Sequence, residues 1–286
     1  MSYKIITDSC CDLSEAMCDQ LDLTVVPMCA TIDGETINRF TEEKLKQIYV
    51  ALRNKVSSST AAANPQDWED AIVPVLEQGE DALVLSFTSG MSTTYQSAVI
   101  AAEELMERYP GRTVKVVDTL CASMGEGLLV YYACKKRDAG MSLEEVTAWC
   151  EENKHHIAHW VTVDDLFHLK RGGRVSAATA VAGTMLQIKP IIHVDTEGRL
   201  VNVGKARGRK AALQTLAKKM ADTQIVGEND TIFISHGDCV EDAEALGEML
   251  KEMCGVKEVI IHYIGAVIGS HAGPGTVALF FLANER

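Results

Sequence analysis

The chain has 286 residues, a formal net charge of −13 and a 47% share of hydrophobic residues. This length suffices for one large domain or two ordinary ones, and the composition is that of a globular protein, not a disordered one. Because an acidic chain repels phosphate backbones, nucleic-acid binding is not expected as its main task.

The cysteines and the hydropathy pattern narrow the cellular compartments and the kinds of site to be expected. There are nine cysteines, an odd number, and Cys10 and Cys11 are adjacent, which is unfavourable for a disulfide framework. No Cys and His residues have the spacing of a zinc site, so neither a metal nor a cofactor is predicted. The sequence has no signal-peptide pattern and no run of about 18 apolar residues. We therefore expect a cytoplasmic protein without a membrane span, for which transient membrane contact stays open.

The first half of the chain alternates strand-like and helix-like segments. Short β-branched runs between turn residues predict strands over 4–7, 23–28, 82–87 and 114–118. Segments with helical periodicity follow, over 42–54, 66–78, 93–108, 122–138 and 142–155. Such alternation predicts an α/β domain over residues 1–157, with a parallel sheet covered by helices.

The pattern changes after residue 157, where strand-like runs come closer together. They lie at 160–163, 189–194, 199–203, 231–236, 259–263 and 277–282, with helices expected only over 209–222 and 240–253. The segment 195–198 (DTEG) between two of these runs is a hairpin signal. This pattern predicts a second, α+β domain over residues 158–286 with a mainly antiparallel sheet.

Several loops expected at one edge of the parallel sheet are rich in hydroxyl groups and glycine. Ligands bind beyond the carboxyl ends of parallel strands, and hydroxyls and backbone N–H groups at helix N-termini bind anions. A further hydroxyl cluster, at 57–60, precedes the helix expected near 66. These loops predict an anion-binding site that contains Asp8, Ser9, Ser89, Gly90, Ser92, Thr93 and Asp118.

Two motifs of the second half also indicate function. The segment 169–174 (LKRGGR) joins paired glycines to three cations, within a stretch (170–210) whose net charge is +7. That stretch is either a solvated basic face or a site for an anionic group or acidic partner. The segment 269–275 (GSHAGPG) predicts a tight glycine-rich turn carrying His271. Phosphate-loop, dinucleotide and zinc-protease motifs do not occur, and Ser92 is not in a nucleophile elbow.

Five segments together resemble the DegV family of bacterial fatty-acid-binding proteins, which includes the acyl-binding partner of the fatty acid kinase system. They are ITDS at 6–9, TSGMSTTYQSA at 88–98, VVDTLCASMGEG at 116–127, LKRGGRVS at 169–176 and GSHAGPGTVALFF at 269–281. Their order and spacing fit over nearly the whole chain. The resemblance implies an N-terminal α/β domain and a C-terminal α+β domain that enclose one long-chain fatty acid, such as palmitate.

The resemblance also implies roles for individual residues. The fatty-acid carboxylate would be held by the hydroxyls of Thr60 and Ser92, with His271 close to the head group. Asp8 and Ser9 match the opening motif of the family. The remaining supporting head-group residues would be Ser89, Gly90, Thr93 and Asp118. Two departures from the family pattern are the alanines at 61–63 and Thr93, which stands where the family usually has glycine.

The sequence therefore predicts a non-catalytic carrier that presents its fatty acid to a separate kinase, which supplies ATP and metal. The residues expected to face this kinase or the acyl-phosphate product are Arg171, Arg174, Lys205 and Arg207. Two alternatives stay open. One is a serine hydrolase that cleaves acyl esters with Ser92 and His271, although a third catalytic member is not evident. The other is a binding domain for a different small anion, such as a phosphorylated metabolite.

Overall fold

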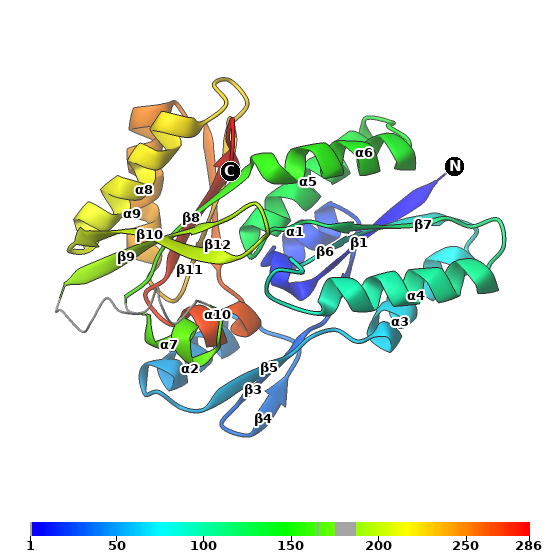
Figure 1. The fold of residues 1–286 in the computed structure, drawn as a ribbon, viewed down its shortest axis with the longest axis horizontal. Coiled ribbons are helices and arrows are strands. Elements are labelled where there is room, and N and C mark those ends of the chain that lie inside the picture. Colours follow the sequence, from blue (N-terminus) through cyan, green and yellow to red (C-terminus); the bar gives the residue numbers. More distant parts are fainter. Residues whose placement is uncertain (1, 165, 175–186) are drawn as a thin grey trace.

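A computed structural model describes residues 2–164, 166–174 and 187–286 of the chain. Its N-terminal half is built on a four-stranded parallel sheet, sheet A, in the order β2-β1-β6-β7. The strands are β1 (Tyr3–Asp8), β2 (Leu23–Val26), β6 (Asp81–Ser86) and β7 (Val114–Asp118). The predicted parallel sheet is therefore confirmed, with its carboxyl edge directed toward the middle of the molecule (Figure 1).

Helices cover both faces of sheet A. Ile6 and Val84 pack against α3 (Pro65–Glu77) and α4 (Thr94–Arg108) on one face, around the fully buried Trp68. Ile5 and Leu83 pack on the other face against α5 (Met124–Asp138), with α6 (Leu143–Asn153) and α1 (Glu15–Gln20) beside it. Because successive strand residues point to opposite faces, a sheet covered on both sides needs continuous apolar runs, as β6 has.

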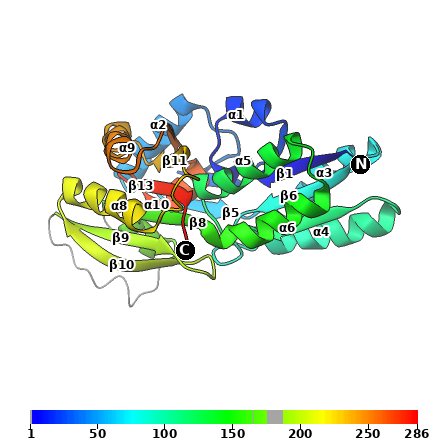
Figure 2. The same cartoon turned by 90° about the horizontal axis from the view of Figure 1, so that it is seen from above.

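The second half is built on a six-stranded sheet, sheet C, in the order β10-β9-β8-β13-β11-β12. All neighbouring pairs are antiparallel except β11 and β12, as the predicted mainly antiparallel sheet requires. Helices α8 (Arg209–Thr223) and α9 (Val240–Cys254) lie at the opposite end of the molecule from α3 and α4 (Figure 2). The strands are β8 (Ile157–Thr162), β9 (Ile188–Val194), β10 (Leu200–Arg207), β11 (Thr231–His236), β12 (Glu258–Tyr263) and β13 (Val277–Leu282).

Several elements were not anticipated from the sequence. A third, antiparallel sheet has the order β4-β3-β5 and is joined to α2 (Glu42–Arg53). The strand expected over 23–28 ends at Val26 instead, since Pro27 lacks the N–H that a strand ladder requires. Three short helical segments flank the sheets: η1 (Ser9–Cys11), η2 (Lys154–His156) and α7 (Phe167–Arg171). The three additional strands are β3 (Cys29–Ile32), β4 (Glu35–Ile37) and β5 (Ser58–Ala61).

The hydrophobic cores extend across residue 157, where the sheets change. The core that contains α2, α3 and α4 also contains Tyr263 and Val267, and the core around α5 also contains Phe233 and Phe280. The hydroxyl of the fully buried Tyr49 in α2 donates a hydrogen bond to the Ile264 carbonyl, at 2.8 Å. The second half is therefore packed firmly against the first.

Candidate functional site

A cavity of about 430 Å³ lies between the carboxyl edge of sheet A and the inner face of sheet C. This size falls in the range of roughly 300–1,000 Å³ that is usual for small-molecule sites. Its wall is mostly apolar and draws on both halves of the chain, including Phe87, Met91, Ile192, Leu200, Val267 and Phe280. The cavity is thus shaped for a ligand with a substantial apolar part.

Part of the wall is made of hydroxyl groups. Thr60 on β5 lines the cavity together with Ser89, Ser92 and Thr93, which belong to the loop between β6 and α4. The Oγ atom of Ser92 lies 2.8 Å from Oγ1 of Thr94 and also accepts a hydrogen bond from the Thr94 N–H, at 3.2 Å. The structure therefore brings four of the predicted head-group residues to one cavity.

His271 joins this group of hydroxyls. It lies in the last turn of α10 (Ala266–Ala272), so the predicted tight turn over 269–275 is wrong for its first half, where helical hydrogen bonds replace it. The Nε2 atom is 2.8 Å from Oγ1 of Thr60, while Nδ1 is buried and has no hydrogen-bond partner among the described residues. Burial and the nearby Arg174 and Arg171 lower the pKa of His271 to about 4, so the imidazole is neutral at pH 7.

Gly172 leaves room for this imidazole. A Cβ atom at Gly172 would lie 2.1 Å from Nδ1 of His271, so the backbone between α7 and Arg174 closes directly over the ring. Arg174 itself lines the cavity, and one of its guanidinium nitrogens donates to the Gly172 carbonyl at 2.6 Å. The LKRGGR segment is thus the end of α7 plus a cavity-lining cation. The last two residues of the longer motif, at 175 and 176, lie outside the described residues.

The other predicted partner-facing cations lie outside the cavity wall. Lys205 and Arg207 are exposed on β10, the edge strand of sheet C. Arg171 is exposed at the end of α7, where its guanidinium donates to Ser58 Oγ at 2.7 Å and to the Val56 carbonyl at 3.3 Å. Arg171 therefore links α7 to the strand that carries Thr60.

Asp8 and Ser9, which were predicted at the head group, accept hydrogen bonds from backbone N–H groups instead. The Asp8 carboxylate is fully buried and accepts hydrogen bonds from the N–H groups of Cys10, at 3.0 Å, and Phe87, at 2.9 Å. Burial raises its pKa to about 6, against the opposing effect of these hydrogen bonds. Ser9 Oγ accepts from the Met28 N–H at 2.9 Å. Neither residue is part of the cavity wall.

Asp118 and Gly90 also act from outside the wall. An Asp118 oxygen accepts from the N–H groups of Ser89 and Leu120, each at 3.1 Å, and so holds the loop that carries the hydroxyls. A Cβ atom at Gly90 would lie 2.4 Å from the Glu197 carbonyl oxygen, so this glycine allows the β9–β10 hairpin loop to approach. Both residues position the hydroxyl loop.

A second polar part of the wall is formed by Ser123 and Thr276, which lie in segments that carry the family resemblance, and by His159, which sequence reasoning did not assign to the site. His159 accepts the Ala122 N–H at Nε2, at 3.1 Å, and its Nδ1 lies 2.9 Å from the Ile157 carbonyl. Burial holds its pKa well below the usual value, so this ring is neutral. The glycine at 125 makes room for this ring, because a Cβ atom there would lie 2.1 Å from His159 Nε2.

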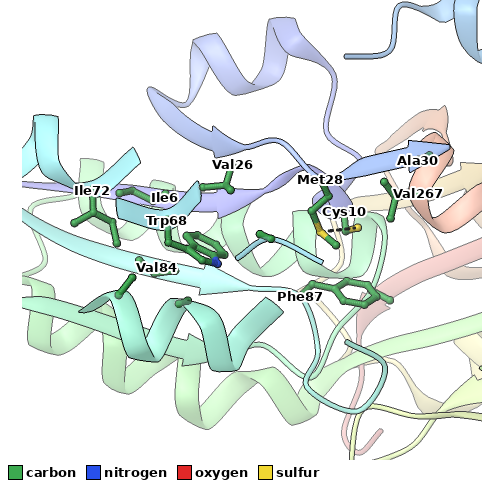
Figure 3. Packing of buried hydrophobic residues seen from close by; sticks show 14 of the residues in the cluster. Ile6, Cys10, Val26, Met28, Ala30, Trp68, Ile72, Val84, Phe87 and Val267 are labelled. Carbon is green, nitrogen blue, oxygen red and sulfur yellow. Dashed lines mark hydrogen bonds between the residues drawn. The ribbon is translucent and has the colours of Figure 1, made fainter. Parts of the chain in front are cut away.

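Two sulfur-containing side chains complete the wall near Phe87. Sγ of Cys10 and Sδ of Met28 are 3.4 Å apart, and Figure 3 shows them between Phe87 and Val267. Both are soft, adaptable groups suited to contact with an apolar ligand.

No hydrogen bond joins Ser92 to His271, the two residues of the hydrolase alternative, in the part of the chain that the structure describes. Ser92 has its hydroxyl contact with Thr94, and His271 has its contact with Thr60. Among the described residues, no three His, Cys, Asp or Glu side chains come together as a metal-binding group. In the same part of the chain, no helix combines the length and hydropathy needed to cross a bilayer.

Comparison with known proteins gives one consistent family. The family model described as "Uncharacterised protein, DegV family" matches residues 2–284. A DegV domain-containing protein of Clostridium perfringens is 45% identical, with 99% of this chain and 98% of the relative covered. Another, of Lactococcus lactis, is 35% identical, with 100% of this chain and 99% of the relative covered.

Solved structures agree with the sequence relatives. A DegV family protein of Thermus thermophilus, described by its fatty acid binding, has a TM-score of 0.88 and 32% identity, covering 99% of this chain and 100% of its own. A DegV lipid-binding protein of Thermotoga maritima has a TM-score of 0.87 and 28% identity, with both chains fully covered. This chain belongs to the DegV family.

Proposed function

We propose that the chain binds one long-chain fatty acid in the cavity, with the carboxylate held by the hydroxyls of Thr60 and Ser92. The observation that carries this proposal is the pairing of a large apolar wall with a cluster of hydroxyls in one cavity. The fatty acid binding described for the Thermus thermophilus relative supports the same ligand class.

The energetics fit a ligand of this kind. Burial of the acyl chain contributes about 0.8 kcal/mol per CH₂, so a chain of about 16 carbons gains on the order of 10 kcal/mol before ordering costs. Two O–H donors hold a carboxylate by charge-assisted bonds, which are stronger than neutral ones. Hydroxyls and a neutral imidazole still bind less tightly than a bidentate arginine clamp, which suits a cargo that must be released or modified.

His271 and Arg174 complete the head-group site. His271 stays neutral at pH 7, so it orients Thr60 through the 2.8 Å contact without adding a charge. Arg174 supplies the positive charge in the wall that a buried carboxylate needs. In this proposal Arg174 meets the ligand as well as the partner.

Mass spectrometry of the purified protein, followed by titration of delipidated protein with palmitate, tests the proposal. We expect a co-purified fatty acid, and Ser92→Ala or Thr60→Ala should weaken palmitate binding by roughly 1.5–3 kcal/mol, the value of one charged hydrogen bond. Ser59→Ala is the matched control, because Ser59 is exposed and adjacent to Thr60 on the same strand. A protein that purifies empty and does not bind palmitate or oleate would refute the function.

We further propose that the loaded protein presents its fatty acid to a separate kinase for acyl-phosphate formation and performs no chemistry itself. The exposed cations on β10 support an acidic partner surface. The double variant Lys205→Glu/Arg207→Glu should slow acyl-phosphate formation in a mixture with the fatty acid kinase and ATP, while palmitate affinity is kept. Lys218→Glu, at an exposed position on α8, is the control. Equal rates for both variants would remove β10 from the kinase interface.

A further inference from the structure

The tip of the β9–β10 hairpin, residues 195–199, lies against the hydroxyl loop, residues 87–93, although the two segments belong to different halves of the chain. The Thr88 hydroxyl donates a hydrogen bond to the Gly198 carbonyl, at 3.0 Å. Along the described chain, no other hydrogen bond joins these two segments. The Thr88 hydroxyl is therefore the polar link between the hairpin tip and the hydroxyl loop.

The same hydroxyl also shapes the hydroxyl loop from inside. Thr88 is fully buried, and its Oγ1 atom accepts a hydrogen bond from the Gly90 N–H, at 3.0 Å. Ser89, which lines the cavity, stands between these two residues. Because the Thr88 proton is directed at the Gly198 carbonyl, the oxygen lone pairs are free to face the Gly90 N–H. The turn that carries Ser89 thus takes its orientation from a carbonyl of the second half.

The hairpin tip has a fixed shape that brings this carbonyl close to Thr88. The Asp195 carboxylate accepts hydrogen bonds from the N–H groups of Glu197 and Arg199, at 3.0 Å and 2.9 Å. Gly198 has φ +72°, and a Cβ atom there would lie 2.0 Å from Thr88 Oγ1, so glycine is needed for both the turn and the close approach. The tip is therefore formed by its own hydrogen bonds before it meets the hydroxyl loop.

Residues on both sides of this contact line the cavity. Val194 and Leu200, which pair across the hairpin next to the tip, belong to the wall, as does Ser89 beside Thr88. Thr88 itself is not among the wall residues. It acts on a ligand only through the loop that it holds.

We propose that Thr88 is a positioning residue for the fatty-acid carboxylate, and that its contact with Gly198 makes recognition of the head group depend on the second half of the chain. This inference rests on the proposed function, since it takes the hydroxyl of Ser92 as a carboxylate ligand. With the contact formed, the loop presents its hydroxyls in one orientation, so the ligand does not have to order them. Without it, the carboxylate is held less tightly, whereas burial of the acyl chain is unchanged.

The test compares two ligands that share a chain and differ in the head group, palmitate and 1-hexadecanol, titrated into the delipidated full-length protein. In Thr88→Val the side chain keeps its shape and loses the hydroxyl. We expect the Kd for palmitate to rise by about three- to tenfold, as for the loss of one hydrogen bond. The Kd for hexadecanol should change by less than about twofold, because chain burial is kept. Thr88→Ser should restore the palmitate affinity.

Hydrogen exchange gives a second measurement that does not depend on hexadecanol. In the ligand-free protein, Thr88→Val should make the amides of residues 87–93 exchange faster than in the unmodified protein, and palmitate should slow them again. Exchange at the same rate in both proteins would show that Thr88 does not order the loop and would overturn the inference.

Thr119→Val is the matched control. Thr119 is equally buried, donates to the Ser86 carbonyl at 2.8 Å and accepts from the Cys121 N–H at 3.2 Å, but both partners lie in the first half. This variant should leave the preference for palmitate over hexadecanol unchanged. Gly198→Ala breaks the contact from the hairpin and should reduce that preference. Gly34→Ala, at a hairpin turn with φ +83° and no described neighbour within 4 Å, should not reduce it.

Two binding results would overturn the inference and leave the proposed function intact. One is a Thr88→Val protein with the unmodified preference for palmitate, and the other is a Thr119→Val protein that loses this preference to the same degree. If Thr88→Val does not fold by circular dichroism, Gly198→Ala decides the question, and an unchanged preference in that variant overturns the inference. An unmodified protein that does not bind palmitate would instead refute the proposed function, and the inference with it.

Discussion

Two polar regions near the carboxyl edge of sheet A differ in whether they line the cavity. One is the hydroxyl wall, formed by Thr60, Ser89, Ser92 and Thr93, which lines the cavity. The other is the carboxyl cluster of Asp8, Asp12 and Glu126, whose side chains are buried at 0%, 5% and 0% exposure. The hydroxyl wall lines the cavity, whereas the carboxyl cluster is buried among hydrogen bonds of the protein, with Glu126 Oε2 left without a partner among the described residues.

The contacts of the carboxyl cluster show what it does. Asp12 accepts from Ser123 Oγ at 2.5 Å and from the Gly265 N–H at 2.9 Å, so it ties the start of α5 to the start of α10. Glu126 accepts from Thr7 Oγ1 at 2.8 Å. Asp12 therefore joins the two halves, whereas Asp8 and Glu126 form hydrogen bonds within the first half. In the proposed fatty-acid complex, this division keeps carboxylates out of the cavity wall, where they would repel the carboxylate of the ligand.

Asp8→Ala has the largest expected effect among the tests that separate the carboxyl cluster from the hydroxyl wall. Two buried backbone N–H groups, of Cys10 and Phe87, would lose their acceptor, at about 1–3 kcal/mol each. We expect the free energy of unfolding, measured by urea denaturation, to fall by about 3–5 kcal/mol. Asp19→Ala, at an exposed position on α1, should change it by less than about 0.5 kcal/mol.

Palmitate titration of Asp8→Ala decides which region Asp8 belongs to. If the folded variant keeps its stability and loses palmitate affinity, Asp8 is part of the head-group site and the two regions are not distinct. Retained affinity with reduced stability places it in the carboxyl cluster.

The second test uses pH and Asp12→Asn. Burial raises the pKa of Asp12 from 3.8 to about 7, so the folded state holds this proton more tightly than the unfolded state does. The resulting contribution to stability is complete below about pH 4 and is lost as the pH rises to about 7. Asparagine cannot titrate, so the difference in unfolding free energy between the two proteins should change by about 1–3 kcal/mol across this window.

Urea denaturation at a series of pH values measures this difference, with Asp19→Asn as the exposed control. A difference that does not vary between pH 4 and pH 7 would mean that Asp12 is ionised throughout this range and that burial does not raise its pKa.

The sequence predicted the fold well because its signals are local. Continuous apolar runs predicted the strands of sheets A and C, and helical periodicity predicted the long helices between them. The closely spaced strand-like runs after residue 157 are those that form sheet C. Strand β5 was not predicted, because its residues, Ser58–Ala61, are small and mostly polar. They form a strand because they pair with β3. The family resemblance nevertheless named Thr60, which lines the cavity.

The site could be predicted as a group of residues but not as a surface. Strand-end position brought Asp8 and Ser92 to one edge, yet which of them faces the cavity depends on where the β9–β10 hairpin and α10 pack. The close approach of Gly172 to His271 could not be predicted from the sequence either, since 99 positions separate the two residues in the chain. Such contacts arise from tertiary packing, which no local pattern encodes.

That contact gives the smallest and most specific test, Gly172→Ala. The backbone there has φ −76°, which alanine adopts without strain, so the effect comes from the new Cβ against His271 Nδ1. The ring must shift from Thr60, and palmitate affinity should fall by about 0.5–1.5 kcal/mol, the value of one neutral hydrogen bond. Gly204→Ala is the control, because its nearest neighbour is Ile191 Cβ at 3.8 Å. If Gly172→Ala binds palmitate normally while Thr60→Ala does not, Thr60 holds the carboxylate without orientation by His271, and the hydroxyl wall is a set of independent donors.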